Sequence, residues 1–462
     1  MFDTLISILS AGGSIKLSLW GVIWDVLSSP VAIGVYAIVL LASIVILISF
    51  VLAGERDKPD PAVLQDCIDR LNDLNRLAER KEAAVSGDGE AAIDSEDDAE
   101  EERAPRFYGL CETDERMRGR KSPLYNESIG FSELCERFRK FCASRMKLYY
   151  DISDVRRFIA SLTVTHLIVM QGMSGTGKTS LAYAFGEFLQ NQSVIVPIQP
   201  MWKERTDLIG YYNEFTKRFN ETTLLQKMYE ANYNDEIYIT VLDEMNIARV
   251  EYYFAEFLSL LEIPDPNKRY LDVVSDRWEN DPKLLVGGKI RLPMNMWFMG
   301  TVNNDDSTFA ISDKVYDRAM VMNLDYKCEP FECEDTPPVK ISAKHWEKLT
   351  AEARADYAIT DRNLRRIAKL DEYLIEKFRI TFGNRIMKQI KGYVPVCIAC
   401  GGTELDAIDD ILSKKVLRKL EAQNPVYVKS MAEPLCAYLD ELFGVDRMPL
   451  CKEYLHRLER NA

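Results

Sequence analysis

The stretch from His166 to Leu181 constrains the fold of this chain most strongly. An apolar run leads into the turn Gly-Met-Ser-Gly-Thr-Gly-Lys-Thr, and a helical pattern continues from the turn to Leu189. A strand, then G-x-x-x-x-G-K-T, then a helix is typical of a phosphate-binding loop. The glycines let successive backbone N–H groups point at phosphate oxygens, and the helix adds the positive end of its dipole. The sequence therefore predicts a nucleotide site here rather than an ordinary glycine-rich turn.

Residues 172–180, named the phosphate loop below, have distinct predicted roles. Lys178 brings a positive charge to the β- and γ-phosphates, and the Thr179 hydroxyl ligates Mg²⁺. The residues expected to bind nucleotide are Gly172, Met173, Ser174, Gly175, Thr176, Gly177, Lys178, Thr179 and Ser180.

Four further apolar runs follow and alternate with helical patterns. They span residues 194–198, 237–242, 296–300 and 319–324. This alternation predicts an α/β fold with a mainly parallel sheet covered by helices on both faces. Ligands of such sheets lie beyond the carboxyl ends of the strands. Polar residues follow two of these runs, Asp243 and Glu244 after one and Asn303 after another. We expect them to meet the phosphate loop at one edge.

These polar residues suit nucleotide hydrolysis. Asp243 is expected to hold Mg²⁺, directly or through water. Glu244 would polarise the attacking water as a general base. Asn303 would orient the same water or contact the γ-phosphate. An alternative for Asn303 is a simple turn residue, because the run Asn-Asn-Asp-Asp that it begins also suits a turn.

The order of these motifs resembles that of AAA+ ATPases of the dynein-related, MoxR and McrB-type branch. The resemblance covers roughly residues 160–330 and is carried by segments 199–212, 242–246, 300–306 and 313–318. It implies a P-loop NTPase fold followed by an α-helical lid, with ATP, or GTP, and Mg²⁺ as cofactors. It also makes Asn303 a sensor of the γ-phosphate.

The resemblance further implies an oligomer. Arg318 matches the position of an arginine finger, which stabilises γ-phosphate charge in a neighbouring subunit, so hydrolysis would need a ring. Arg385 would be the nucleotide-binding arginine of the lid. For Arg318 a surface salt bridge is the alternative interpretation. For Arg385 a purely structural role is the alternative.

Residues 31–53 contain no charged side chain. As a helix they would be about 34 Å long, enough to cross a bilayer core of roughly 30 Å. Since a nucleotide site needs cytosolic nucleotide, we expect a single-pass membrane protein with its ATPase domain in the cytoplasm. The expected parts are a short N-terminal segment (1–29), a transmembrane helix (30–53), a helical connector with an acidic disordered tether (54–105), a helical lead-in (106–162), the nucleotide-binding domain (163–334) and a helical lid domain (339–462).

Charge and cysteine content limit the partners. A net charge of −14 argues against direct nucleic-acid binding through a basic surface. The ten cysteines have no disulfide-framework spacing and are expected to be free thiols. A zinc site built from Cys328, Cys333, Cys397 and Cys400 is an alternative. The three histidines are isolated in the sequence, and His166, at the start of an apolar strand, suits a core or edge position better than catalysis.

Three functions remain open from the sequence. The first is an oligomeric membrane-anchored ATPase that remodels or moves an unknown protein client. The second is a McrB-like GTPase ring that drives a separate nuclease in phage defence, although this chain carries no nuclease motif. The third is a membrane scaffold that is gated by nucleotide without turnover. Glu244 and Asn303 favour turnover over the scaffold.

Overall fold

The computed structural model describes residues 105–303, 308–324, 326 and 328–461. The chain divides into two compact units, residues 1–93 and 94–462, and all described residues belong to the second. The predicted transmembrane helix (30–53) and nearly all of the connector and tether (54–105) lie outside the described residues. Among the helices of the described part, none is long and apolar enough to span a membrane.

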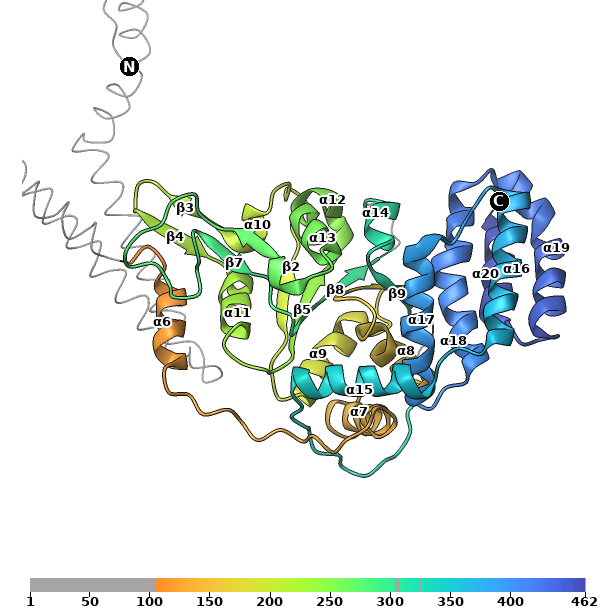
Figure 1. Ribbon diagram of the computed structural model, residues 1–462, viewed down its shortest axis with the longest axis horizontal. Coiled ribbons are helices and arrows are strands. Elements are labelled where there is room, and N and C mark those ends of the chain that lie inside the picture. Colours follow the sequence, from red (N-terminus) through yellow and green to blue (C-terminus); the bar gives the residue numbers. More distant parts are fainter. Residues whose placement is uncertain (1–104, 304–307, 325, 327, 462) are drawn as a thin grey trace, which may run out of the picture. The chain divides into compact units, whose positions relative to one another are not determined.

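A five-stranded parallel sheet forms the centre of this unit (Figure 1). The strand order is β2-β5-β8-β1-β9, and every neighbouring pair runs parallel. The strands are β1 (Leu167–Gln171), β2 (Val194–Pro197), β5 (Tyr238–Asp243), β8 (Met296–Val302) and β9 (Met320–Asn323). All five correspond to the predicted apolar runs. Strand β8 is buried along its whole length and extends to Val302.

Both faces of the sheet are buried, which confirms the predicted layering. Successive side chains of a strand point to opposite faces. Accordingly, Ile168 and Met170 of β1 join one hydrophobic cluster, while Leu167 and Val169 join another. The first cluster includes side chains of helices α7 (Phe131–Met146), α8 (Ile152–Leu162) and α9 (Lys178–Phe188). The second includes side chains of helices α11 (Thr223–Ala231) and α13 (Ala255–Glu262).

Several short elements were not predicted from the sequence. Two antiparallel hairpins, β3 (Gly210–Asn213) with β4 (Arg218–Glu221) and β6 (Tyr270–Asp272) with β7 (Lys289–Arg291), interrupt the alternation of strands and helices. Strands of three or four residues are too short to show a clear period. Helix α6 (Tyr108–Met117) precedes the sheet. The remaining described helices before residue 339 are single turns, namely α10 (Thr206–Ile209), η1 (Met245–Ile247), α12 (Val250–Tyr253), η2 (Pro266–Lys268) and α14 (Asp313–Tyr316).

The chain becomes wholly helical after residue 342. This helical region (residues 339–461) contains α15 (Ala343–Asp356), α16 (Asp361–Phe378), α17 (Gly383–Ala399), α18 (Glu404–Ile411), η3 (Leu412–Val416), η4 (Leu417–Ala422), α19 (Pro425–Phe443) and α20 (Pro449–Asn461). In α16 the Thr360 hydroxyl accepts from the N–H of Asn363 as an N-cap. An apolar stripe of α16 is buried at Ile367, Leu370, Leu374 and Phe378.

Residues 405–420 repeat apolar side chains at helical spacing but do not form one regular helix. Helix α18 ends at Ile411, and the chain continues as a π-helix (η3) and then a 3-10 helix (η4). Single π-helical turns are rare and frequently mark functional positions. Here the change of winding buries two consecutive lysines, Lys414 and Lys415, each of which contacts a different partner.

Candidate nucleotide-binding site

The phosphate loop joins β1 to α9 and depends on its glycines. Gly172, Gly175 and Gly177 have φ angles of 144°, 78° and 89°, a region that other residues rarely adopt. A Cβ at Gly172 would lie 2.3 Å from the carbonyl oxygen of Leu324. The Tyr150 hydroxyl donates to the carbonyl of Gly177 at 3.1 Å, so the segment before α8 also supports the loop.

Lys178 lies across the phosphate loop. Its Nζ donates to the carbonyl oxygens of Gly172 at 2.8 Å and Met173 at 2.7 Å, and the side chain is 6% exposed. Helix α9 begins at this residue, with Gly177 as an N-cap that offers no side-chain acceptor. The start of a helix suits an anion because its first N–H groups point along the axis, and here the lysine charge lies beside them.

Asp243 is the meeting point of three elements. It ends β5, and its Oδ1 accepts from the Thr179 hydroxyl of α9 at 2.7 Å and from the Thr301 hydroxyl of β8 at 2.9 Å. The parallel register aligns the carboxyl ends of β5, β8 and β1, which explains why residues so distant in sequence meet. A hydroxyl and a carboxylate are the hard oxygen ligands that Mg²⁺ prefers, so Thr179 and Asp243 fit that ion.

Glu244 directly follows Asp243 at the end of β5. Its φ of 53° is left-handed, and its side chain is exposed. Its N–H donates to the Thr301 hydroxyl at 2.8 Å, and the Asn303 Nδ2 lies 3.5 Å from its Oε1. The structure therefore brings the predicted base, the predicted sensor and the predicted Mg²⁺ ligand to one edge of the sheet.

The sequence does not predict two residues that support the site. Thr301 links Asp243 to the backbone of Glu244 through one hydroxyl. Asn246, 3% exposed, donates from Nδ2 to the carbonyl of Asn303 at 2.9 Å. The signal for Thr301 was a hydroxyl at the second-last position of an otherwise apolar strand. Asn246 lies two residues after the pair Asp243 and Glu244, but the sequence does not predict its contact with Asn303.

The structure places the two predicted arginines together, on one carboxylate. Arg318 follows α14 and donates from Nη2 to Oε2 of Glu262 at 2.5 Å. Arg385, near the start of α17, pairs with the other oxygen of Glu262. Arg385 thus contacts Glu262 beside Arg318, whereas the prediction puts it at the nucleotide. Both nucleotide roles remain predictions.

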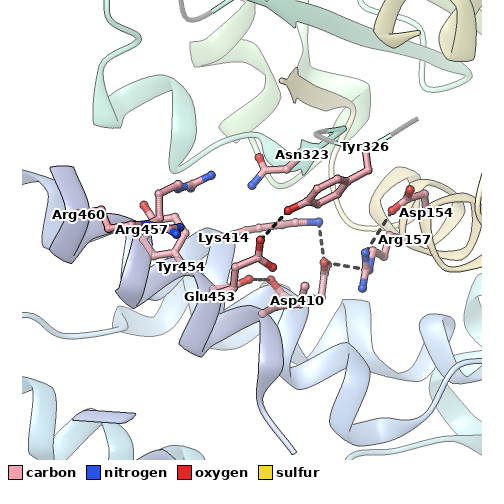
Figure 2. Close-up of a pocket in the computed structure, with 12 residues that line it drawn as sticks. Asp154, Arg157, Asn323, Tyr326, Asp410, Lys414, Glu453, Tyr454, Arg457 and Arg460 are labelled. Atoms are coloured by element: carbon pink, nitrogen blue, oxygen red, sulfur yellow. Dashed lines mark hydrogen bonds and ion pairs between the residues drawn. The ribbon is translucent and has the colours of Figure 1, made fainter. Parts of the chain in front are cut away.

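A cavity of about 160 Å³ lies at the carboxyl end of β9, between α8 and the helical region (Figure 2). At its centre, the buried Asp410 pairs with Lys414 at 2.6 Å and with Arg157 at 3.2 Å. Asn323, which ends β9, lines the cavity from the sheet. Strand β9 pairs with β1, so the cavity adjoins the edge that carries the phosphate loop. The ionic network ties the helical region to α8 there.

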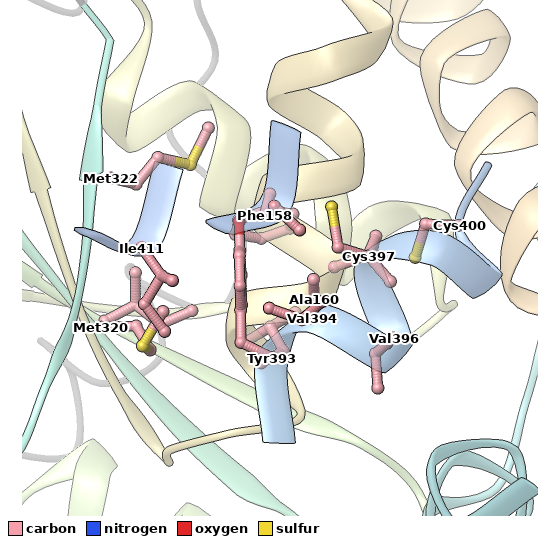
Figure 3. Close-up of a cluster of buried hydrophobic side chains, with 14 of the residues drawn as sticks. Phe158, Ala160, Met320, Met322, Tyr393, Val394, Val396, Cys397, Cys400 and Ile411 are labelled. Carbon is pink, nitrogen blue, oxygen red and sulfur yellow. The ribbon is translucent and has the colours of Figure 1, made fainter. Parts of the chain in front are cut away.

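The four cysteines considered for zinc do not meet. Cys397 and Cys400 are buried in the hydrophobic core beside Tyr393 and Val394 (Figure 3). Burial raises the pKa of the Cys397 thiol to about 12, which disfavours the thiolate that binds metal. Among the described residues, the one group with metal-ligand proximity is the surface set Glu433, His456 and Glu459. The nine described cysteines are free, as expected.

Comparison with known families agrees with this geometry. Residues 167–319 match the AAA domain of the dynein-related subfamily. Residues 337–462 match a domain of unknown function, DUF8727. The sheet, the phosphate loop and this match together support a P-loop nucleoside triphosphatase fold of the AAA+ type for the central domain.

Similarity to individual proteins is distant. A candidate ATPase from Cytophaga hutchinsonii has 11% identity and a TM-score of 0.45, covering 75% of this chain and 98% of that one. A full-length MCM homologue from Methanopyrus kandleri has 11% identity and a TM-score of 0.36, covering 63% of this chain and 61% of that one. No curated protein matches this chain.

Proposed function

We propose that this chain is a membrane-anchored AAA+ ATPase that binds and hydrolyses ATP in an oligomer to remodel or move a protein partner. The observation that carries the proposal is the contact of Asp243 with both Thr179 and Thr301, with Glu244 at the adjoining position. This arrangement brings the phosphate loop beside an acidic pair whose chemistry suits a metal ligand and a general base. A scaffold without turnover would not need Glu244 or Asn303.

The residues divide the work of phosphoryl transfer. The loop N–H groups and Lys178 would hold the phosphates, and Thr179 and Asp243 would hold Mg²⁺, which when bound would neutralise phosphate charge. Glu244 would accept a proton from the attacking water. Asn303, whose Nδ2 lies 3.5 Å from Oε1 of Glu244, would orient that water. Catalysis then depends on positioning and charge more than on covalent chemistry.

The paired arginines support an oligomer. Arg318 and Arg385 place two cations on one carboxylate, and the Arg318 side chain is 21% exposed. If the half-buried Arg318 guanidinium leaves Glu262, it can reach the γ-phosphate in a neighbouring subunit, because carboxylate and phosphate oxygens suit the same donor geometry. We therefore infer that each site is completed by Arg318 of the next subunit in a ring, with Arg385 on the same side.

The membrane anchor and the client rest on the sequence. The uncharged segment 31–53 supports a single span, and the nucleotide requirement supports a cytoplasmic ATPase domain. The net charge of −14 supports a protein client over nucleic acid.

Mixing two inactive variants of the full-length protein in detergent tests the proposal. Arg318→Ala should bind ATP nearly normally but lose on the order of 10³-fold in hydrolysis, as for other arginine fingers. Glu244→Gln removes the base and leaves Arg318 intact. Their mixture should recover phosphate release, with a maximum near equal proportions, because some interfaces join an intact Glu244 to an intact Arg318. Background activity at every ratio, with subunit exchange shown by fluorescence transfer, would reject the trans arrangement.

A further inference from the structure

The helical region contacts the backbone that carries Arg318 through a buried lysine. Lys415, on the π-helix η3, donates from Nζ to the carbonyl oxygen of Tyr316 at 2.5 Å and to that of Ala319 at 2.6 Å. The lysine is 6% exposed. These two carbonyls flank Arg318 on either side, at the end of α14. Carbonyls at a helix end lack intrahelical donors, and a lysine there satisfies them.

Two neighbouring side chains of the helical region hold the same segment. Gln389 of α17 donates to the carbonyl of Asp317 at 3.1 Å. The guanidinium of Arg418, on η4, lies over the Tyr316 ring. Three helical elements therefore converge on residues 316–319, and Lys415 is the contact that spans Arg318.

The held segment also touches the strand that leads into the phosphate loop. The Tyr316 hydroxyl accepts a hydrogen bond from Nε2 of Gln171, the last residue of β1. The segment that carries Arg318 is thus in contact with the strand that leads into the phosphate loop of its own chain. A shift of the backbone at residues 316–319 would move the origin of the Arg318 side chain.

Burying a lysine is costly, which argues against a merely passive contact. Desolvation lowers the pKa of Lys415 to about 7, opposed by Asp317 and assisted by the cations Arg418, Arg385 and Lys419. A neutral amine still carries two N–H donors, so both hydrogen bonds survive loss of the charge. Lys415 therefore holds residues 316–319 through its two hydrogen bonds, which do not require its charge.

We propose that Lys415 is a positioning residue for Arg318: it fixes the backbone from which the arginine reaches the neighbouring subunit. The inference rests on the proposed trans role of Arg318. Removing Lys415 should then lower hydrolysis while leaving nucleotide binding intact. The expected loss is on the order of 10- to 100-fold, the range expected when a catalytic group is misplaced by about 1 Å.

The test is a complementation experiment with Lys415→Met in the full-length protein. A Lys415→Met subunit keeps its own Glu244 but presents Arg318 poorly. Mixed with Glu244→Gln, it should recover turnover, because the Glu244→Gln subunit supplies a well-placed Arg318. Mixed with Arg318→Ala, it should recover none. A subunit that is damaged in its own nucleotide site would not show this asymmetry.

Lys419→Met is the matched control, because Lys419 donates to the carbonyl of Thr381 within the helical region. It should keep wild-type turnover. Gln389→Ala, which removes the donor to Asp317, should give a weaker form of the same asymmetry and serves if Lys415→Met does not fold. Wild-type turnover in both Lys415→Met and Gln389→Ala, or equal behaviour with both partners, would overturn the inference. If Arg318→Ala and Glu244→Gln themselves fail to complement, the proposed function fails instead.

Discussion

Single polar atoms decide how the candidate site is organised. The Thr301 hydroxyl donates to Asp243 and accepts from the N–H of Glu244, so one oxygen contacts both the predicted metal ligand and the predicted base. Gly300, one residue earlier, leaves room for Met245, whose Sδ would lie 1.8 Å from a Cβ at that position. The acidic pair is therefore held by β8 as much as by its own strand.

Thr301→Val should reduce turnover without weakening nucleotide binding. The valine keeps the shape but leaves the Glu244 N–H unpaired, which costs about 1–3 kcal/mol and frees the base. We expect turnover to fall by roughly 10- to 100-fold as the base loses its position.

Lys178→Ala, in contrast, should abolish nucleotide binding while the protein still folds. Titration with fluorescent ATP and phosphate-release assays separate the two.

Thr301→Ser is the control, since it retains the hydroxyl and should keep most of the activity. Wild-type turnover in Thr301→Val would show that the hydroxyl does not position Glu244. Wild-type ATP affinity in Lys178→Ala would contradict the assignment of the phosphate loop.

Elements are joined by contacts that their own patterns do not show. His166 immediately precedes β1, stacks on Trp297 with ring centroids 5.0 Å apart, and its Nε2 lies 2.9 Å from the carbonyl of Met294. The histidine thus links the starts of β1 and β8, at the end of these strands opposite the phosphate loop. Its contacts agree with a structural role.

This histidine should make stability depend on pH. Desolvation lowers the pKa of His166 from its usual 6.5 to about 4. Above pH 6.5 the ring is neutral in both folded and unfolded chains, and its full contribution to stability is present. As the pH falls from 6.5 towards 4, the unfolded chain takes up the proton first, so the free energy of unfolding falls by on the order of 2–3 kcal/mol.

Urea unfolding of wild type and His166→Phe across this pH range measures the effect. The phenylalanine keeps the stacking on Trp297 but cannot take up a proton, so the variant should lose less stability on acidification. Parallel pH curves for the two proteins would show that His166 is not responsible.

At the scale of the whole molecule, the helical region and the sheet are coupled through buried polar contacts. Asp410 pairs with Arg157 of α8, and Lys415 bonds to the segment that carries Arg318. A buried pair that loses one partner leaves an uncompensated charge, so these contacts are costly to break. A movement of the helical region would therefore displace or strain both α8 and the segment that carries Arg318.

Deleting residues 1–53 should release a protein that no longer needs detergent and still binds ATP. Residues 31–53 are the uncharged run on which the membrane prediction depends, and the nucleotide site lies wholly in the second compact unit. Fractionation of cell membranes measures the first effect and ATP titration the second. Retention of the truncated protein in the membrane pellet would contradict the anchor assignment.

The sequence by itself determined the phosphate loop, the five parallel strands and the polar residues at their carboxyl ends. These follow from local patterns, because apolar runs and glycine spacing reflect the nearest residues of the chain. The edge on which Lys178, Asp243 and Asn303 meet then follows from the rule for parallel sheets.

Only the tertiary structure decided the remaining contacts. Glu262 pairs with both Arg318 and Arg385. Lys415 donates hydrogen bonds to the carbonyls of Tyr316 and Ala319. These contacts join residues that are between 56 and 123 positions apart in the sequence. No local period encodes such pairs, since they arise when packed elements bring a donor and an acceptor together out of water. The π-helix that carries Lys415 also depends on tertiary contacts. Its winding follows the contacts of its side chains with other elements rather than the spacing of its own apolar residues.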